Sequence, residues 1–328
     1  MTLFWAVVLA MSVLLYVLLD GADLGVGILF GMTRDETHRR AMMGAVAPIW
    51  DGNETWLIVT GVVLWGAFPI VYATLLSALY LPLLAMLAGL ILRGVAFEFR
   101  EKTARMRWLW NLSFASGSLF AAFMQGVMVG ALVKGLPIVH GRYAGSELAW
   151  LSPFAIWCGI GLCLGYALLG ACWLVKKCEA QVRDTAYRAI PALSAALVAF
   201  LIVVFAAALH EHLAVMNRWL ERPYLLIFPL IAALSALVLA VSVRRRRDGP
   251  PIFMAMLAFS AAFGTLAISF WPYMIPFSIT VADAAAPHAS LAFMFWGAGL
   301  FVFPLMLIYT AVGLRVFRGK VTLSPDSY

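Results

Sequence analysis

The chain has 328 residues, of which 64% are hydrophobic and 12% are charged, and its mean hydropathy is +0.95. A soluble domain carries roughly half apolar and about a quarter charged residues, so this composition excludes a soluble globular protein. The formal charge of +7 comes from basic residues spread over many loops, which argues against a nucleic-acid-binding surface. We therefore expect a single integral-membrane domain over residues 1–328.

An apolar helix of about 20 residues crosses the hydrocarbon core of a bilayer. The uncharged run from Leu57 to Leu92 is too long for one crossing at about 1.5 Å per residue, and Pro69 with the Tyr72–Thr74 region offers a break for a tight helical hairpin. The sequence thus predicts an all-α polytopic membrane protein with nine transmembrane helices. These lie near residues 3–30, 56–72, 75–97, 113–133, 151–175, 189–209, 223–243, 252–272 and 290–314.

The basic residues predict the orientation of the chain. Most of the 23 Lys and Arg residues fall in alternate loops and in the C-terminal tail, whereas the intervening loops hold only Lys134, Arg142, Arg218 and Arg222. The positive-inside rule then places the N-terminus outside and the C-terminus in the cytoplasm, as an odd number of helices requires. The N-terminal apolar run lacks the basic n-region of a signal peptide, so we interpret it as the first permanent helix.

Ionisable side chains inside membrane helices are costly and mark functional sites. Asp20 and Asp23 lie three residues apart, on one face of the first helix. With the predicted orientation, the end of the first helix, the start of the second and the end of the third share the cytoplasmic half of the membrane. A chain of carboxylates opening to the cytoplasm is what a proton path needs. The candidate path residues are Asp20, Asp23, Asp51 and Glu54, with a supporting polar group of Asn53, Trp56, Arg93 and Glu98.

Structural interpretations of the same residues stay open. Asp51, with Glu54 three residues later, resembles a capping box, so Asp51 could serve only as a helix N-cap. Glu54 could be a simple first-turn charge, and Arg93 could only neutralise one carboxylate. Asp20 and Asp23 are harder to explain in this way, because a carboxylate pair in a membrane segment needs a partner or water.

The histidines argue against a haem in this chain. His38 falls in an inner loop, and the others fall in outer loops or at outer helix ends, so a haem held between two helices by histidines is not expected. The spacing of His210-Glu-His212 does not align on a helix face, and we expect no metal there. The remaining histidines are His140 and His288.

Other marks along the chain indicate helix packing. Gln125 is one polar group in a stretch of small residues that includes Gly117, Gly126 and Gly130, and such stretches let membrane helices approach closely. We expect the cysteines, which all fall on or beside the fifth helix, to be small buried packing residues.

Several motifs together resemble subunit II of the cytochrome bd-type quinol oxidases. The match runs from the first helix to the ninth, and its Trp-Asp-Gly-Asn motif is specific. The absence of a large outer loop resembles the shorter, cyanide-insensitive type. The motifs are Asp20-Gly-Ala-Asp23-Leu-Gly-Val-Gly27, Ala47-Pro48-x-Trp50-Asp51-Gly-Asn53-x-x-Trp56-Leu, Arg93-Gly-Val-Ala-Phe97-Glu98-Phe-Arg100 and Trp271-Pro-Tyr-Met-Ile-Pro276.

The resemblance implies two four-helix bundles plus one peripheral helix, in a bacterial plasma (inner) membrane. It implies a haem-free subunit that pairs with a subunit I carrying the haems, either two b-type and one d-type or all b-type. Such a complex oxidises quinol and reduces oxygen to water with protons from the cytoplasm. A structural quinone on this chain and a small single-helix accessory subunit are left open. Lipids are the remaining expected partners, and no nucleic acid is.

By the same resemblance, Asp51 matches the acidic position assigned to the proton path, and Asp20 with Asp23 matches the neighbouring acidic pair. Glu54 departs from the members that have an uncharged residue there. A proton-coupled secondary transporter would also place carboxylates in the membrane, but it favours inverted repeats and broken helices at the midplane, and the sequence shows no repeat. A purely structural assembly subunit is the third hypothesis.

Overall fold

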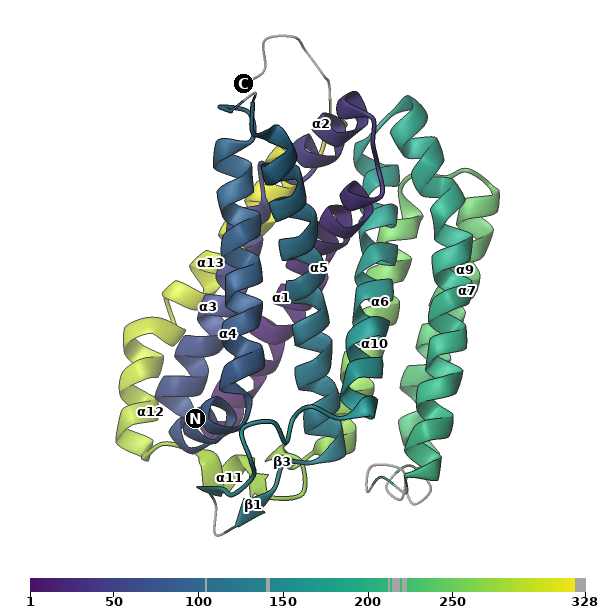
Figure 1. Cartoon of the computed structure of the whole chain (residues 1–328). Coiled ribbons are helices and arrows are strands. Elements are labelled where there is room, and N and C mark those ends of the chain that lie inside the picture. The colour runs from purple at the N-terminus through teal and green to yellow at the C-terminus, as the bar shows by residue number, and fades with distance from the viewer. Residues whose placement is uncertain (104, 140–141, 212, 214–218, 220–222, 322–328) are drawn as a thin grey trace.

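The computed structural model describes residues 1–103, 105–139, 142–211, 213, 219 and 223–321, most of them in long helices (Figure 1). The long helices are α1 (Thr2–Gly31), α3 (Trp50–Ala67), α4 (Pro69–Phe99), α5 (Arg107–Lys134), α6 (Pro153–Lys177), α7 (Ala180–His210), α9 (Ile227–Arg244), α10 (Pro250–Phe270) and α13 (Val302–Val316). The short helical segments are α2 (Glu36–Gly44), η1 (Pro223–Leu226), α11 (Val281–Ala284), α12 (His288–Met294) and the π-helical η2 (Phe295–Gly299).

Eight segments of the described chain are long and apolar enough to cross a membrane. They are α1, α4, α5, α6, α7, α10, the segment Tyr224–Arg244 and the segment His288–Val316. Helix α3 is outside this set, because its first two turns carry Asp51, Asn53 and Glu54. The described chain is therefore mainly helical and multi-pass, with its strands confined to short loop hairpins.

Proline sets the starts of several helices. The predicted break is confirmed at Pro69, since α3 ends at Ala67 and α4 begins at Pro69, where a missing N–H costs no helical hydrogen bond. The Tyr72–Thr74 region, also expected in the break, lies inside the first turns of α4. Pro153 begins α6 in the same way, and the hydroxyl of Ser152 accepts a hydrogen bond from the Ala155 N–H at 3.2 Å. Although α3 and α4 are consecutive, α3 packs mainly on α1 and α4 mainly on α5.

Small residues let the central helices touch through their backbones. A side chain on Gly25 of α1 would overlap the backbone of α6 at Tyr166, and Gly170 of α6 meets the backbone of Gly25 in return. Gly117 of α5 likewise contacts the carbonyl of Gly89 on α4. These contacts confirm the packing role predicted for the small-residue stretch of α5, and they put α1 at the centre of the main core with α5 and α6.

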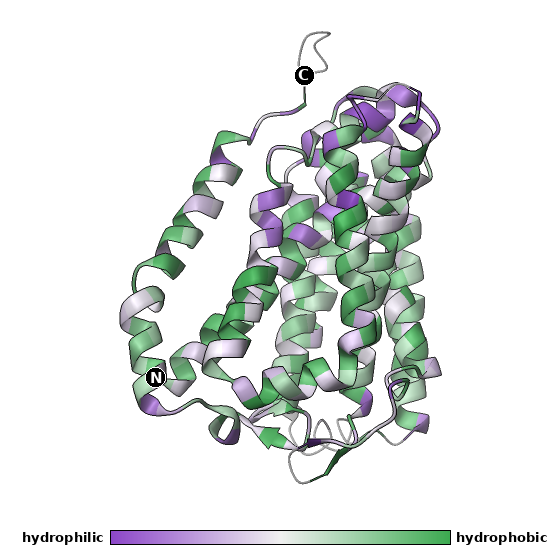
Figure 2. Cartoon of the chain, turned by 60° about the vertical axis from the view of Figure 1, so that its left-hand side comes forward, coloured by the Kyte–Doolittle hydropathy of each residue, from purple (hydrophilic) through white to green (hydrophobic). Residues whose placement is uncertain are grey.

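Helix α13 lies at the edge of the molecule. None of its residues is buried, and Figure 2 shows the segment of α12, η2 and α13 standing beside the main body. Most of the length of the bundle is apolar, and hydrophilic residues gather at the end that carries α2 (Figure 2).

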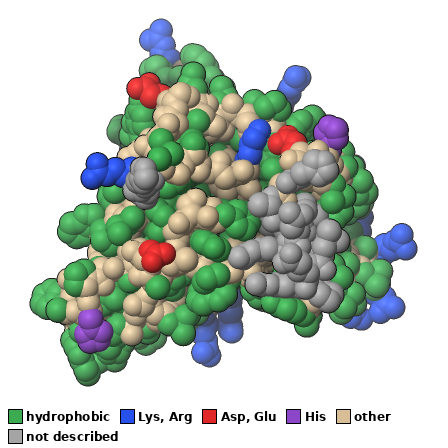
Figure 3. All heavy atoms as spheres, turned by 90° about the horizontal axis from the view of Figure 1, so that it is seen from below, with side chains coloured by type: hydrophobic (Ala, Val, Ile, Leu, Met, Phe, Trp, Pro, Cys, Tyr) green, Lys and Arg blue, Asp and Glu red, His purple; other side chains and the backbone are tan. Residues whose placement is uncertain are grey.

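The opposite end, seen in Figure 3, has only scattered charged side chains among hydrophobic and uncharged ones. Two short antiparallel hairpins, absent from the predicted fold, lie in the loops there (Figure 1). One pairs β1 (Ile138–Val139) with β2 (Arg142–Tyr143), and the other pairs β3 (Tyr273–Ile275) with β4 (Ile279–Thr280).

Candidate functional site: a buried acidic network

Arg93 joins three helices through two ion pairs. Its Nη1 lies 2.6 Å from Oδ1 of Asp20 on α1, and its Nη2 lies 2.9 Å from Oε2 of Glu54 on α3. The side chains of Arg93 and Asp20 are fully buried, and that of Glu54 is 26% exposed. Arg93 thus pairs with two carboxylates at once, rather than with the single one considered from the sequence.

A second link joins α1 to α3 beside the first. Nδ2 of Asn53 donates a hydrogen bond to Oδ2 of Asp23 at 2.7 Å, and both side chains are buried. Among the described residues, Oδ1 of Asp23 has no hydrogen-bond partner, and neither has Oδ2 of Asp20. The network therefore keeps carboxylate oxygens available to another donor.

Charge counting indicates what this network can do. Asp20, Asp23 and Glu54 face one guanidinium, that of Arg93, so full ionisation would leave two negative charges without a partner in an apolar bundle. Buried uncompensated charge is costly, and neighbouring carboxylates titrate as a coupled group rather than singly. The arrangement can therefore take up and hold a proton among its members.

Three of the predicted site residues lie apart from this network. Asp51 is exposed in the first turn of α3; its interpretation as the N-cap is wrong, because Ile49 occupies that position. Glu98 is exposed and pairs with Lys102, one helical turn away, at 3.0 Å. Trp56 is fully buried, and its Nε1 donates to Oγ1 of Thr310 at 3.2 Å, which ties α3 to α13.

A buried chain of three polar side chains was missed by sequence reasoning. The hydroxyl of Tyr166 on α6 donates to Oε1 of Gln125 on α5 at 2.8 Å, and Nε2 of Gln125 donates to the hydroxyl oxygen of Tyr16 on α1 at 2.8 Å. Tyr16 lies four residues before Asp20, on the same helix face. The spacing of four between Tyr16 and Asp20 is the sequence signal that could have predicted this chain. From the sequence, Gln125 is interpreted only as part of a helix-packing stretch.

The hydrophilic end of the molecule holds separate ion-pair clusters. Asp248, between α9 and α10 and so outside the membrane-spanning segments, binds Arg183, Tyr187 and Lys320 at 2.8 Å each. Partial burial works against its charge, but the hydrogen bonds from Arg183, Lys320 and Tyr187 prevail and lower the pKa of Asp248 to about 2. This cluster ties Lys320 of the C-terminal segment to the start of α7 and to the connection between α9 and α10.

The histidines and cysteines form no evident metal site in the described part of the chain, where no group of three or more His, Cys, Asp or Glu side chains is arranged to hold a metal ion. His38 lies in α2, His210 ends α7 and His288 begins α12. His140 and His212 lie outside the described residues, as do Arg218 and Arg222 of the charge pattern. The expected absence of haem therefore stays a prediction.

Comparison with known proteins identifies the family. The family of cytochrome bd terminal oxidase subunit II matches residues 1–317. The chain is 30% identical to the probable cytochrome oxidase subunit 2 of Haemophilus influenzae, over 94% of this chain and 89% of that protein. It is 28% identical to the cytochrome bd-I ubiquinol oxidase subunit 2 of Escherichia coli K12, over 97% of this chain and 94% of that one.

A more distant relative and a solved structure agree with this. The cytochrome bd ubiquinol oxidase subunit 2 of Bacillus subtilis is 27% identical, over 97% of this chain and 96% of that protein. The fold is similar to a chain of the bd oxidase structure from Geobacillus thermodenitrificans, with a TM-score of 0.79, 15% identity and 96% of each chain covered. With a family match across nearly its whole length, this multi-pass membrane chain belongs to the cytochrome bd terminal oxidase subunit II family.

Proposed function

We propose that this chain is the haem-free subunit of a quinol oxidase in the bacterial plasma membrane, and that it supplies part of a proton path from the cytoplasm. It pairs with a haem-bearing subunit I, and the complex oxidises quinol and reduces oxygen to water. The observation that supports this most is the network in which Asp20 and Glu54 pair with Arg93 across three helices, with the Asp23–Asn53 hydrogen bond beside them.

In this proposal the chain's own residues receive, hold and pass on protons. The free oxygen of Asp23 accepts a proton that water relays from the cytoplasm, and Arg93 stabilises whichever of its carboxylate neighbours is ionised. Glu54, which is partly exposed, offers a way out of the network. Asp51, exposed at the start of the same helix, then stands where a path leaves this chain.

The proposed topology has nine crossings, with α3 as the ninth beside the eight apolar segments, two four-helix bundles, and α13 as the peripheral helix. The hydrophilic end then faces the cytoplasm and the N-terminus lies outside, in keeping with the positive-inside rule. Helix α13 presents exposed Leu305, Ile308 and Tyr309, an apolar face suited to a membrane partner. Asp51 lies near this helix, since a side chain on Gly52 would come within 3.2 Å of Tyr309.

The first experiment isolates the chain from membranes in mild detergent and records an absorption spectrum of what accompanies it. We expect a polytopic haem-bearing partner, with no haem on this chain once separated. A colourless, lone chain at full stoichiometry would contradict the oxidase proposal and favour the transporter.

The proton role is tested with Asp20→Asn and Asp51→Asn in the purified complex. We expect normal haem content with quinol-dependent oxygen consumption slowed by ~tenfold or more, within the range for loss of a proton-transferring group. Glu179→Gln, a matched change at an exposed carboxylate at the hydrophilic end, should keep full activity. Full activity in the Asp variants would remove the proton role, and loss of subunit I would favour a purely structural assembly role.

A further inference from the structure

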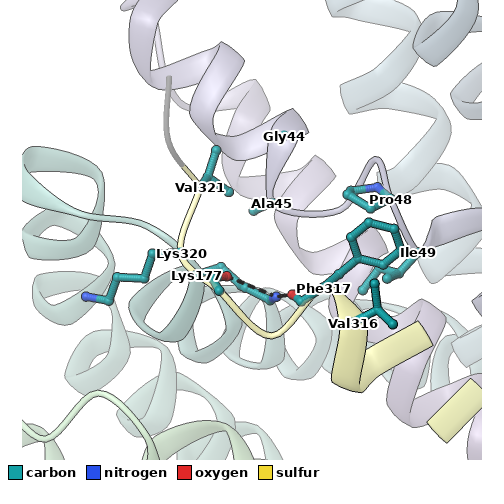
Figure 4. A pocket seen from close by; sticks show the side chains of 10 residues that line it. Gly44, Ala45, Pro48, Ile49, Lys177, Val316, Phe317, Lys320 and Val321 are labelled. Atoms are coloured by element: carbon teal, nitrogen blue, oxygen red, sulfur yellow. Dashed lines mark hydrogen bonds between the residues drawn. The ribbon is translucent and has the colours of Figure 1, made fainter. Parts of the chain in front are cut away.

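A cavity of about 300 Å³ opens at the hydrophilic end of the molecule (Figure 4). It lies between the connection from α2 to α3, the end of α6, and the chain that follows α13. Its lining includes Pro48, Ile49, Lys177, Phe317 and Lys320, and Figure 4 shows the ring of Phe317 beside Pro48 and Ile49. Because Pro48, Phe317 and Lys320 are exposed, water has access to this outer cavity.

A second, much smaller cavity lies next to the acidic network. Its volume of about 10 Å³ is room for about one water molecule. Asp23 and Asn53 contribute its polar wall, and Trp173 and Met256 contribute part of its apolar wall. Asp23 is 2% exposed, and its Oδ1 has no hydrogen-bond partner among the described residues. A water in this inner cavity would therefore meet an available carboxylate oxygen.

Ile49 belongs to the walls of both cavities. It is the N-cap residue of α3, so its side chain stands where the loop from α2 turns into the helix that carries Asn53. We propose that these two cavities form the inlet through which water from the cytoplasm reaches Asp23, with the side chain of Ile49 as the apolar gate between them. This inference rests on the proposed proton-path function and names where that path begins.

The two lysines that line the outer cavity, Lys177 and Lys320, do not oppose the entry of water and protons. Nζ of Lys177 donates to the carbonyl oxygens of Phe317 and Gly319 (the bond to Phe317 is drawn in Figure 4), and the carbonyl of Lys177 accepts from the Val321 N–H at 2.8 Å. Lys320 is paired with Asp248 at 2.8 Å. Both lysines are thus engaged by oxygen atoms, and together they hold the C-terminal segment as one wall of the outer cavity.

The inlet is separate from Asp51, which lines neither cavity.

The wall between the two cavities includes Trp173, whose Nε1 donates a hydrogen bond to the carbonyl of Ala45 at 3.0 Å. Ala45 itself lines the outer cavity. The indole of Trp173 therefore lies between the two spaces and can report on water that passes Ile49.

The test is X-ray hydroxyl-radical footprinting of the intact oxidase complex, in which water radiolysis oxidises side chains that contact water. Trp173 and Trp56 are both buried, at 5% and 0% exposure, but only Trp173 lines the inner cavity. We expect Trp173 to oxidise several-fold faster than Trp56. Ile49→Phe should lower the rate at Trp173 to that of Trp56 and slow quinol-dependent oxygen consumption, whereas Ile49→Ala should raise the rate at Trp173.

Ile58→Phe is the matched control, because it makes the same change at an exposed site on the same helix; it should alter neither readout. Equal oxidation of the two tryptophans in the unmodified complex would overturn the inlet. So would an Ile49→Phe complex that excludes water from Trp173 yet keeps its full turnover and haem content. The proposed function fails on a different result, namely full turnover in Asp20→Asn and Asp51→Asn, whatever the footprint shows.

Discussion

The guanidinium of Arg93 lies 2.6 Å from the carboxylate of Asp20, and neither side chain has any exposed surface. Arg93 lies on α4 and Asp20 on α1, and the two residues are 73 positions apart in the chain. A buried ion pair of this kind is a weak source of net stability, but removing one partner leaves the other charge uncompensated. The ion pair therefore helps to fix the position of α4 relative to α1, although α1 packs mainly on α3, α5 and α6.

Substitution of Arg93 should destabilise the subunit strongly. We expect Arg93→Gln to cost ~3–5 kcal/mol, because it strands the buried carboxylate of Asp20. Thermal unfolding of the purified complex measures the loss. The double variant Asp20→Asn with Arg93→Gln should regain part of it, and a double variant as unstable as Arg93→Gln alone would show that the ion pair is not the cause.

Gln125 should be needed to hold α1, α5 and α6 together. Gln125→Leu leaves the buried hydroxyls of Tyr16 and Tyr166 without their partner, at a cost of ~1–3 kcal/mol per unsatisfied group. Ser116→Ala is the control on the same helix, since that hydroxyl only bonds the Leu112 carbonyl at the surface. Unfolding of the two variants at the same temperature would contradict the prediction.

Adding a methyl group where α1 contacts α6 should destabilise the subunit. Gly25→Ala places its Cβ against the backbone of Tyr166, and overpacking of this kind costs ~1–3 kcal/mol. At Gly61 of α3 nothing lies within 4 Å of an added Cβ, so Gly61→Ala should be neutral or should stabilise the helix by ~0.5–1 kcal/mol. The measurement is the yield of the assembled complex and its melting temperature. Equal tolerance at both sites would argue against close backbone contact.

The cluster around Asp248 should make the C-terminal segment sensitive to acid. Because the folded state lowers the pKa of Asp248 to about 2, its stabilising effect is complete above the ordinary carboxyl pKa and is lost as the pH falls toward that lowered value. Limited proteolysis of the C-terminal segment at a series of pH values should show rising cleavage as the medium is acidified. Asp248→Asn should be cleaved faster at neutral pH, and the difference from the unmodified chain should shrink in acid.

The membrane class, the break at Pro69 and the family followed from the sequence. Composition alone excludes a water-facing fold, since no soluble surface could hide so many apolar side chains. Proline ends one helix and begins the next by its own geometry. The family resemblance rested on short motifs around Asp20, Asp51 and Arg93 and needed no structure, and the family match across residues 1–317 confirms it.

Depth in the membrane also follows from sequence, because a helix rises by a fixed amount per residue. That is why Asp20, Asp23, Asn53, Glu54 and Arg93 could be placed at one level before any contact was known. The rotation of each helix about its axis does not follow in the same way, because hydropathy is nearly uniform around a membrane helix. The packing of the helices against one another sets this rotation.

Tertiary packing therefore turned Glu98 out to Lys102 and left Asp51 on the surface, while it turned Arg93 inward to two carboxylates. Tertiary packing also joined Gln125 to Tyr16, which is 109 positions away in the chain, and to Tyr166, which is 41 positions away. No local sequence pattern encodes these pairings. The two cavities on either side of Ile49 are the clearest case, because the walls of the outer one come from three separate segments and those of the inner one from five. The physical reason is the same in each instance: local sequence sets where a helix begins and how deep each residue lies, and only the close approach of backbones such as Gly25 and Gly170 sets which side chains meet.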